Sequence, residues 1–484
     1  MRTPRAARRC VTDCAAMRTR TLLLAPLLLS TSCATVSPKA QAPDATTAEA
    51  KSPAPERPFG TLREQAKRQQ AWLAERVEKA LPQLMRQYGV DMWVIPMREY
   101  NEDPVFKALV SPTSFAARRR TIYVFFDRGP EQGVERLALG GGSQGGLYTP
   151  RRAQRQVDGG GVSREAELWG PEQWQVLKQV VEERQPKRIA LNVSRTFAFA
   201  DGLSHGEYEG MSEALGPDWV KRFTSVDGLA VDFIAWRSAD EARFYEEQTK
   251  LAWNIIETAF SNQVITPGVT TTRDVEWWMR QRLADLGLET WFQPSVDLQR
   301  QGVTEKELGE DPIIQRGDVL HCDYGVTALG LNTDTQHMGY VLREGETDVP
   351  AGLKAALKTS NRLQDIVFEE LRPGRTGNDI LRTSRERMRA EGIDGTVYSH
   401  PIGLHGHGAG PMVGLWDRQE GVPGNGDHKV IANQWYSIEL QATSVVPEWN
   451  GQQVRSAQEE DITIDAEGRV HWAWKRQTDF HLVR

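Results

Sequence analysis

Apolar residues spaced three or four positions apart divide much of the chain into predicted amphipathic helices. The first of these helices opens the folded part of the chain, with six apolar residues on one face. These residues are Trp72, Leu73, Val77, Leu81, Leu84 and Met85. Further helices are predicted at residues 171–183, 239–262, 272–286, 353–371 and 379–391. Gly287 is placed to end the fourth of these six helices.

Short continuous apolar runs among the first helices predict buried strands. They lie at residues 91–95, 121–126 and 188–192. Together with the helix at 171–183 they give the alternating order of an α/β domain. The glycine-rich segment 140–146 lacks the Lys-Ser/Thr pair and the following helix of a phosphate-binding loop, so we predict an ordinary loop there.

The pattern changes near residue 235, where a long amphipathic helix begins. Another helix, strands of alternating character and two further helices follow it, and strands then dominate to the end. A chain of 484 residues is too long for one ordinary hydrophobic core. We therefore predict two folded domains. An N-terminal α/β domain is expected at residues 61–234 and an α+β domain at residues 235–484.

The segment that precedes the first helix is predicted to direct export. Residues 1–33 have the order of an export signal, because basic residues precede the apolar run Leu22–Leu29 and Cys33 follows in a lipobox-like position. The apolar run is far shorter than the roughly 20 residues of a membrane-spanning helix. We expect a bacterial lipoprotein of the periplasm or outer membrane, attached to the membrane only through its N-terminal lipid.

Residues 34–60 are rich in proline and alanine and contain almost no large apolar side chains. Such a segment cannot bury enough surface to fold, so we predict a disordered tether between the anchor and the folded domains. The start of the chain is left open between Met1 and Met17.

The charge balance argues against nucleic acid as a partner. The chain has 59 basic and 65 acidic residues and a net charge of −6, and no basic stripe lies beyond the extreme N-terminus. Of the four cysteines, only Cys33 and Cys322 would remain after processing, so we expect no disulfide in the mature fold.

Two aspartates suggest a site that needs a cation. Asp323 and Asp334 lie in two predicted strands, and a turn centred on Ala328 and Leu329 would make them cross-strand partners on one face. Facing buried carboxylates repel each other unless a cation neutralises them or one of them is protonated. The alternative is that both aspartates simply flank an exposed turn.

Histidines and glutamates farther along the chain add candidate ligands. His400, His405 and His407 lie close together among glycines, which suggests a metal ligand with a neighbouring proton donor. The alternation of strand 435–442 places Glu439 on its polar face. In the strand around residues 458–464, parity favours Glu459 over Glu460 as a ligand, although a charged strand edge is an alternative interpretation.

Together, four carboxylates and one histidine suit two divalent ions. Manganese, cobalt, zinc and iron all accept such oxygen and nitrogen ligands, and we place manganese first. Two ions roughly 3.5 to 4 Å apart activate water and polarise a carbonyl, so hydrolysis is the reaction expected.

The order Asp, Asp, His, Glu, Glu resembles that of the pita-bread family, which includes methionine aminopeptidase, Xaa-Pro aminopeptidase, prolidase and creatinase. The first aspartate stands in an Asp-x-Gly context, 11 residues before the second. A His-x-x-Gly-x-x-x-His motif matches His400, Gly403 and His407. The resemblance implies an α+β fold, with a C-terminal pita-bread catalytic domain and an N-terminal creatinase-type α/β domain.

The resemblance also implies the roles of individual residues. It assigns the metal ligands as Asp323, Asp334, His400, Glu439 and Glu459. It makes His407 the residue that contacts the scissile carbonyl and Glu439 the general acid/base. We take His405 and Trp416 as further substrate-binding residues.

The activity implied is that of an Xaa-Pro aminopeptidase or dipeptidase acting on short peptides, in an enzyme that forms a homodimer. Three positions depart from the proline-specific pattern, namely Thr396, Ala457 and His337. They favour one alternative, a creatinase-like C–N hydrolase or lyase on the same fold. A metal-free binding protein that has kept the fold is a second alternative, against which the five retained ligands argue.

Overall fold

The computed structural model describes residues 56–152, 154–155, 164–165 and 172–484, which lie in one compact unit. The predicted export signal at residues 1–33 and the tether up to residue 55 lie outside these described residues. Within them, no helix is long and apolar enough to cross a membrane. Cys322, the one cysteine in the described ranges, is a buried free thiol.

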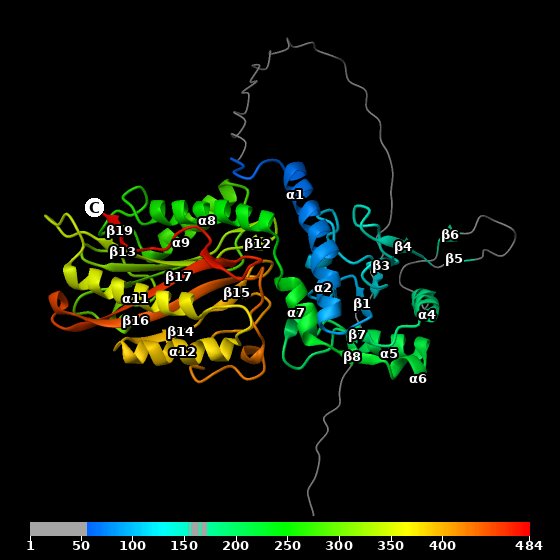
Figure 1. The fold of residues 1–484 in the computed structure, drawn as a ribbon. Helices are drawn as coiled ribbons and strands as arrows, with labels where there is room; N and C mark the ends of the chain where they lie inside the picture. The colour runs from blue at the N-terminus through cyan, green and yellow to red at the C-terminus, as the bar shows by residue number, and fades with distance from the viewer. Residues whose placement is uncertain (1–55, 153, 156–163, 166–171) are drawn as a thin grey trace, which may run out of the picture. The chain divides into compact units, whose positions relative to one another are not determined.

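The N-terminal part contains a six-stranded sheet in the order β4-β3-β2-β1-β7-β8 (Figure 1). Its strands are β1 Met92–Arg98, β2 Arg120–Asp127, β3 Val134–Leu139, β4 Thr149–Arg151, β7 Ile189–Leu191 and β8 Phe223–Ser225, and a separate hairpin pairs β5 Gln154–Arg155 with β6 Arg164–Glu165. Its helical segments are α1 Leu62–Glu75, η1 Arg76–Ala80, α2 Leu81–Gln87, α3 Phe106–Leu109, α4 Glu172–Arg184, η2 Ala198–Ala200, α5 His205–Leu215, α6 Pro217–Val220 and α7 Asp227–Ala235.

Helices cover both faces of this sheet, which explains why its central strand β1 is apolar and buried from Met92 to Met97. On β1, Trp93 and Ile95 pack in a core with α1, α2 and α7. Their neighbours Met92 and Val94 pack in a second core with α4 and α5. The sheet is mixed, because β1 runs antiparallel to β2 and parallel to β7. Residues 140–146 form a loop, as predicted.

The C-terminal part is built on a nine-stranded sheet. Its main order is β14-β16-β17-β13-β10-β9, and β15, β18 and β19 pair with β16, β17 and β13. The strands are β9 Ser295–Gln299, β10 Val319–Tyr324, β13 Thr335–Val341, β14 Asp394–Val397, β15 His400–Ile402, β16 Trp435–Val446, β17 Gln452–Ile464, β18 Val470–Trp472 and β19 His481–Val483, and a small hairpin pairs β11 Thr327–Ala328 with β12 Leu331–Asn332.

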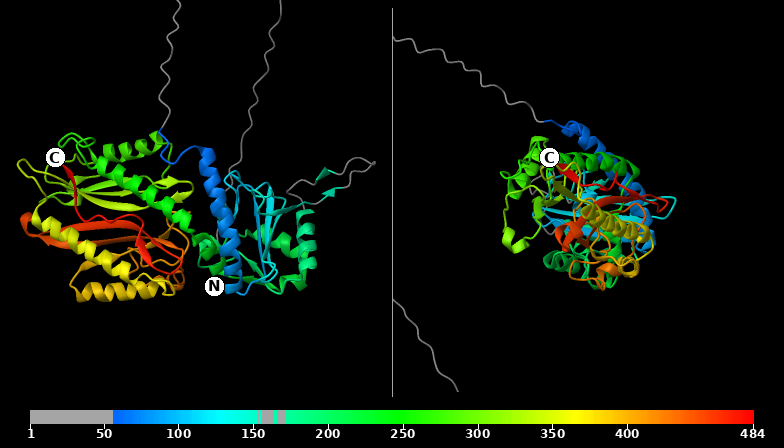
Figure 2. Two further views of the ribbon diagram at one scale, coloured as in Figure 1. Left: turned by 45° about the horizontal axis from the view of Figure 1, so that its top comes forward. Right: turned by 90° about the vertical axis from the view of Figure 1, so that its left-hand side faces the viewer.

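Four long helices pack on this sheet as two pairs (Figures 1 and 2). The helical segments here are α8 Ala239–Ala259, α9 Thr272–Asp285, α10 Glu305–Leu308, α11 Ala351–Glu370, α12 Gly377–Ala390, η3 Asn425–Asp427 and η4 Pro447–Trp449. Helices α8 and α9 share a core with β9 and β10, whereas α11 and α12 share one with β14, β16 and β17. The predicted boundary near residue 235 falls between α7 and α8, and the division into domains there stays a prediction.

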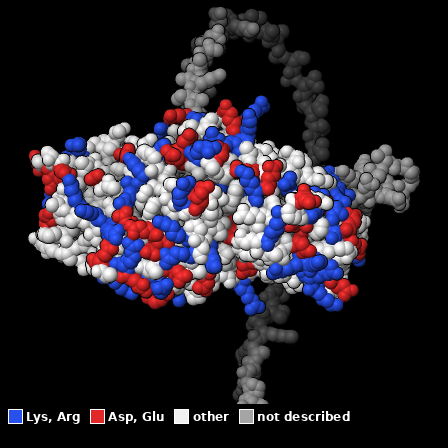
Figure 3. Space-filling model, viewed as in Figure 1, with Lys and Arg blue, Asp and Glu red and all other residues white. Residues whose placement is uncertain are grey.

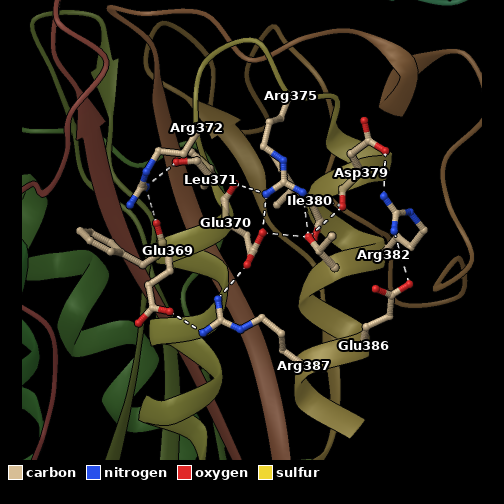
Figure 4. Close-up of polar contacts among 12 residues, drawn as sticks. Glu369, Glu370, Leu371, Arg372, Arg375, Asp379, Ile380, Arg382, Glu386 and Arg387 are labelled. Atoms are coloured by element: carbon tan, nitrogen blue, oxygen red, sulfur yellow. Dashed lines mark hydrogen bonds and ion pairs between the residues drawn. The ribbon is translucent and has the colours of Figure 1, made fainter. Parts of the chain in front are cut away.

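Acidic and basic side chains are interspersed on the face seen in Figure 3, including over α11 and α12. The ends of these two helices are joined by charged hydrogen bonds (Figure 4). Glu370 accepts hydrogen bonds from Arg375, from Arg387 Nη1 at 2.8 Å and from Thr383 Oγ1 at 3.0 Å. Arg387 also contacts Glu369. The carboxylate of Glu370 is therefore the centre of the network.

We expect Glu370→Gln to lower the free energy of unfolding by about 1–2 kcal/mol at neutral pH, because it weakens hydrogen bonds to a charged acceptor. Burial acts to raise the pKa of Glu370, but the bonds from Arg387, Arg375 and Thr383 outweigh it and lower the pKa. The stabilisation is thus present above the ordinary value of 4.5 and is lost as the pH falls through the folded-state value. Urea unfolding at pH 7 and pH 3 tests this, with the exposed Glu386→Gln on α12 as control. An equal deficit at both pH values would contradict it.

Candidate metal centre

The five predicted ligands come from five neighbouring segments of the C-terminal sheet. Asp323 lies on β10, Asp334 directly precedes β13, His400 opens β15, and the two glutamates lie on β16 and β17. Glu439 and Glu459 are direct cross-strand partners. The alternating pattern of β16 therefore holds, since Ile438 and Leu440 pack into the helix-covered core on the other face.

The ligand atoms of these residues meet within the distances that a metal ion needs. Three groups each have ligand atoms within 4.8 Å of one another. The groups are Asp323, Asp334 and Glu459; His400, Glu439 and Glu459; and Asp334, His400 and His407. His400 Nε2 lies 3.1 Å from Glu459 Oε1 and 3.6 Å from Asp334 Oδ2. The structure thus brings all five residues to one place, and their role as ligands stays a prediction.

Burial and mutual repulsion disfavour the charged forms of the carboxylates in this cluster. Burial, followed by the charge of Glu459, raises the pKa of Asp323 to about 7 and that of Glu439 to about 9, and the pKa of Asp334 is also raised. The Oδ1 atoms of Asp323 and Asp334 are buried without a hydrogen-bond partner. Buried carboxylates with unused lone pairs fit divalent cations as the missing partners.

His400 is the basic member of the cluster. Burial alone would lower its pKa, but the hydrogen bond and charge of Glu459 and the charge of Glu439 raise the pKa of His400 to about 9. Its Nδ1 lies 3.0 Å from the carbonyl oxygen of Pro401 and is oriented by it. A metal ion at Nε2 would replace a proton there.

The predicted pairing of Asp323 with Asp334 is wrong. Asp323 pairs with Gln336, because the turn is centred one residue later, on Leu329 and Gly330. Both of these residues have positive φ, 51° and 78°. Moving the centre by one residue shifts the register by two positions, which preserves the side-chain alternation, so both aspartates still reach the cluster.

Glu459 and Glu460 point to opposite faces of β17. Glu460 contacts Trp253 Nε1 at 3.2 Å, His337 Nε2 at 3.1 Å and the Gln477 amide at 2.8 Å. His337, at one of the positions that depart from the proline-specific pattern, is therefore bound behind the sheet and not in the cluster. The alternation along the strand had favoured Glu459, which is the glutamate that pairs with Glu439.

Gln336, the side chain at the centre of the carboxylates, was not predicted from the sequence. Its Nε2 donates to Glu439 Oε1 at 2.7 Å and Glu459 Oε2 at 2.9 Å. Its Oε1 lies 3.0 Å from His321 Nε2, and His321 Nδ1 lies 2.8 Å from Asp297 Oδ2. Gln336 stands two positions after Asp334, so the strand period was the one signal that could have found it.

A second missed contact orders the backbone at Asp334. Asp461 Oδ2 accepts hydrogen bonds from the Tyr245 hydroxyl at 2.8 Å and from the Asp334 amide at 3.1 Å. Tyr245 stacks on Trp435, with ring centroids 4.2 Å apart. Helix α8 thus supports the cluster through a buried side chain.

The three predicted substrate-binding residues lie in different surroundings. His407 belongs to the cluster with Asp334 and His400. Trp416 is partly exposed and its ring lies 5.5 Å from that of Tyr398. His405 is in none of the three groups. It packs on Phe199 and lines a cleft of about 1230 Å³ together with residues of α1.

The positions that depart from the proline-specific pattern do not supply a cation to the cluster. Thr396 pairs with Gln441 in the β14–β16 ladder. Ala457 is buried, and the neighbouring Arg455 pairs with Asp297 at 3.2 Å.

A family model described as Metallopeptidase family M24 matches residues 247–464. No curated protein matches the chain. Among solved structures, it resembles an X-Pro aminopeptidase from Thermotoga maritima, with TM-score 0.55 and 17% identity over 83% of this chain and 100% of that one. It also resembles dipeptidase PepE from Mycobacterium ulcerans, with TM-score 0.54 and 16% identity over 85% and 98%. An Xaa-Pro dipeptidase from Bacillus anthracis gives TM-score 0.52 and 16% identity over 85% and 99%. At these identities, the structural likeness concerns the fold alone.

Proposed function

Because the chain belongs to metallopeptidase family M24 through residues 247–464 and has the fold of the pita-bread enzymes, we propose that it is a dinuclear-metal peptidase acting on short peptides. It removes an N-terminal residue or splits a dipeptide. The predicted family and the fold class, a C-terminal pita-bread domain after an N-terminal α/β domain, are confirmed, as is the prediction of a metallohydrolase. The proposal rests above all on the two buried Oδ1 atoms of Asp323 and Asp334 that lack a partner.

The residues that would hold the two ions are Asp323, Asp334, His400, Glu439 and Glu459. Manganese is our first choice of metal, with cobalt, zinc or iron as alternatives. When bound, such ions polarise the scissile carbonyl and lower the pKa of an attacking water. Carboxylate oxygens are hard donors, and cations would replace the protons that these buried groups otherwise hold. The donor set therefore suits divalent ions of this kind.

The protein's own groups complete the reaction. Glu439 accepts a proton from the attacking water and passes it to the nitrogen of the leaving amine. Gln336 donates to Glu439 Oε1 and so holds that carboxylate in place. His407, at the exposed end of the cluster, donates a hydrogen bond to the carbonyl oxygen as negative charge develops on it.

The proposal extends to the setting of the enzyme. We propose export as a bacterial lipoprotein of the periplasm or outer membrane, lipidated at Cys33, and assembly as a homodimer. The export signal supports the first, and the resemblance to the Xaa-Pro aminopeptidase branch supports the second.

A second candidate is a creatinase-like C–N hydrolase or lyase on the same fold. The observation that favours it concerns two of the positions that differ from the proline-specific pattern. Thr396 and Ala457 carry no charge, and the nearby Arg455 is paired with Asp297. A peptidase that binds the carboxylate of a proline dipeptide would need a positively charged side chain there. The buried carboxylates without partners argue against a metal-free binding protein.

The test compares the metal-stripped and the manganese-loaded chain. Metal per chain is measured by mass spectrometry, and hydrolysis is followed on a panel of Xaa-Pro peptides, other dipeptides and tripeptides, and small amines and betaines. Close to two ions per chain with peptide hydrolysis only in the loaded protein is the expected result. Bound metal with activity on amines or betaines alone would favour the second candidate, and a chain that binds no metal would overturn both.

A further inference from the structure

Tyr398 brings a hydroxyl group into the metal cluster that none of the predicted roles uses. It lies two residues before His400 and its side chain is buried. Its hydroxyl oxygen lies 3.2 Å from His407 Nε2, which is its one hydrogen-bond partner among the described residues. Its ring is 5.5 Å from that of His400. Tyr398 thus joins the predicted ligand to the predicted substrate-binding histidine.

The hydrogen bond between these two side chains has a preferred direction. A phenol keeps its hydrogen at neutral pH, so Tyr398 has a donor to place, and His407 Nε2 is the available acceptor. When Nε2 accepts, the one hydrogen of a neutral imidazole lies on Nδ1. The contact therefore selects one tautomer of His407 as well as one rotation of its ring.

Trp291 provides a second contact that restrains His407. The two rings meet edge to face with centroids 5.2 Å apart. Trp291 itself is held by a hydrogen bond of 3.0 Å, which its Nε1 donates to the backbone carbonyl oxygen of Thr333. Gly406 lies so close beneath the indole that an added Cβ would stand 2.2 Å from it. The partly exposed His407 is thus packed on a fixed surface although it lies at the mouth of the cluster.

We infer that Tyr398 is a positioning residue of this centre, which holds His407 in the rotation and tautomer required to meet the scissile carbonyl oxygen. The inference rests on the proposed peptidase function for its kinetic consequence, but not for the hydrogen bond itself. Packing on Trp291 does not distinguish the two ring nitrogens, so without the phenol the exposed His407 can exchange tautomers in water. Tyr398 acts through His407 and does not itself touch the substrate.

We expect Tyr398→Phe to lower kcat about tenfold while KM changes less than about twofold, because the phenyl ring preserves the packing and removes only the hydrogen bond. Metal content and melting temperature should match those of the wild type. The matched control is Tyr88→Phe, which removes a phenol hydrogen bond of 2.6 Å to Asp232 in the N-terminal part and should leave kcat unchanged.

A double-mutant cycle with His407→Ala separates positioning from direct action. Once His407 is absent, Tyr398→Phe should cost less than about twofold in kcat, because the residue it positions is gone. An equal tenfold loss in both backgrounds would overturn the inference and make Tyr398 a substrate-contacting group. A loss of bound metal in Tyr398→Phe would also overturn it, in favour of a structural role.

Nuclear magnetic resonance of ¹⁵N-histidine in the zinc-loaded protein tests the hydrogen bond without any substrate. The His407 ring signals are assigned by their absence from His407→Ala. We expect an unprotonated Nε2 and a protonated Nδ1 in the wild type, and exchange between tautomers in Tyr398→Phe. Identical His407 signals in the two proteins would overturn the inference. If the wild type cleaves no peptide while these signals differ, the proposed function fails and the positioning role of Tyr398 stands.

Discussion

Glu459→Gln will reduce peptidase activity by about 10³-fold and remove at least one metal ion, whereas Glu460→Gln will retain both activity and metal. Glu459 lies in two of the three groups of ligand atoms and is the cross-strand partner of Glu439. An amide in its place would offer a cation a neutral oxygen instead of an anionic carboxylate. Losing several kcal/mol of charge stabilisation corresponds to about that factor in rate. Metal analysis and kcat/KM on the best peptide substrate provide the measurement.

Glu460→Gln is a close control because the two residues are adjacent on β17. Burial is the main cause that raises the pKa of Glu460 well above its usual range, and an amide has nearly the size and shape of the carboxyl group that it replaces. Its partners, including Trp253 and the Gln477 amide, lie on the face away from Glu439. If Glu460→Gln loses the metal and Glu459→Gln keeps it, the assignment of Glu459 as the metal ligand of β17 is wrong.

Elements with strong local signals were predicted within a few residues. Helix α8 was expected at 239–262 and runs from Ala239 to Ala259. Ser238 caps it through a reciprocal contact with Glu241, and its apolar residues face the sheet. Such signals lie within one or two turns of the helix, which is why sequence alone reveals them.

The face of the sheet to which a strand side chain points could be predicted, whereas the register between two strands could not. The period of two placed Glu439 and Glu459 on the ligand side, and the structure places both there. The β10–β13 register was wrong because the turn is centred on Leu329 and Gly330, not on Ala328 and Leu329. Glycine suits the left-handed conformation of residue 330, but leucine rarely adopts the same conformation at residue 329, so the two residues together are a weak turn signal.

Contacts between distant residues were beyond the reach of any local pattern. Tyr245 and Asp461 are 216 positions apart, and neither belongs to a motif. Gln336 becomes a central hydrogen-bond donor only because β10, β13, β16 and β17 lie side by side. The candidate ligands could therefore be proposed from residue type, spacing and family resemblance, whereas the side chains that orient them depend on the tertiary fold.

Asp323, Glu439 and His400 should make the metal-free protein lose stability as the pH rises from about 6.5 to 9. The pKa of Asp323 is raised from its ordinary value of 3.8 to about 7 and that of Glu439 from 4.5 to about 9, by burial first and then by neighbouring charge. The folded protein thus holds protons that the unfolded chain has released. For His400, the partners outweigh burial and raise the pKa from 6.5 to about 9, so its contribution is complete below 6.5 and is lost as the pH rises through about 9. All three groups have the same sign.

Bound metal should reverse this trend, because cations replace the protons that hold the carboxylates together. At a free metal concentration of a thousand times Kd, binding stabilises the folded state by about 4 kcal/mol, and fewer protons compete at higher pH. We therefore expect the rise in melting temperature on adding metal to be larger at pH 8.5 than at pH 5.5. Calorimetry of the stripped and loaded protein across this range provides the measurement.

Glu439→Gln in the stripped protein should flatten the decline, since it removes a group that must otherwise ionise in a buried site. A stripped wild type whose stability is constant or increases from pH 6.5 to 9 would show that these carboxylates are not held together by protons, and would remove the electrostatic argument for the metal centre.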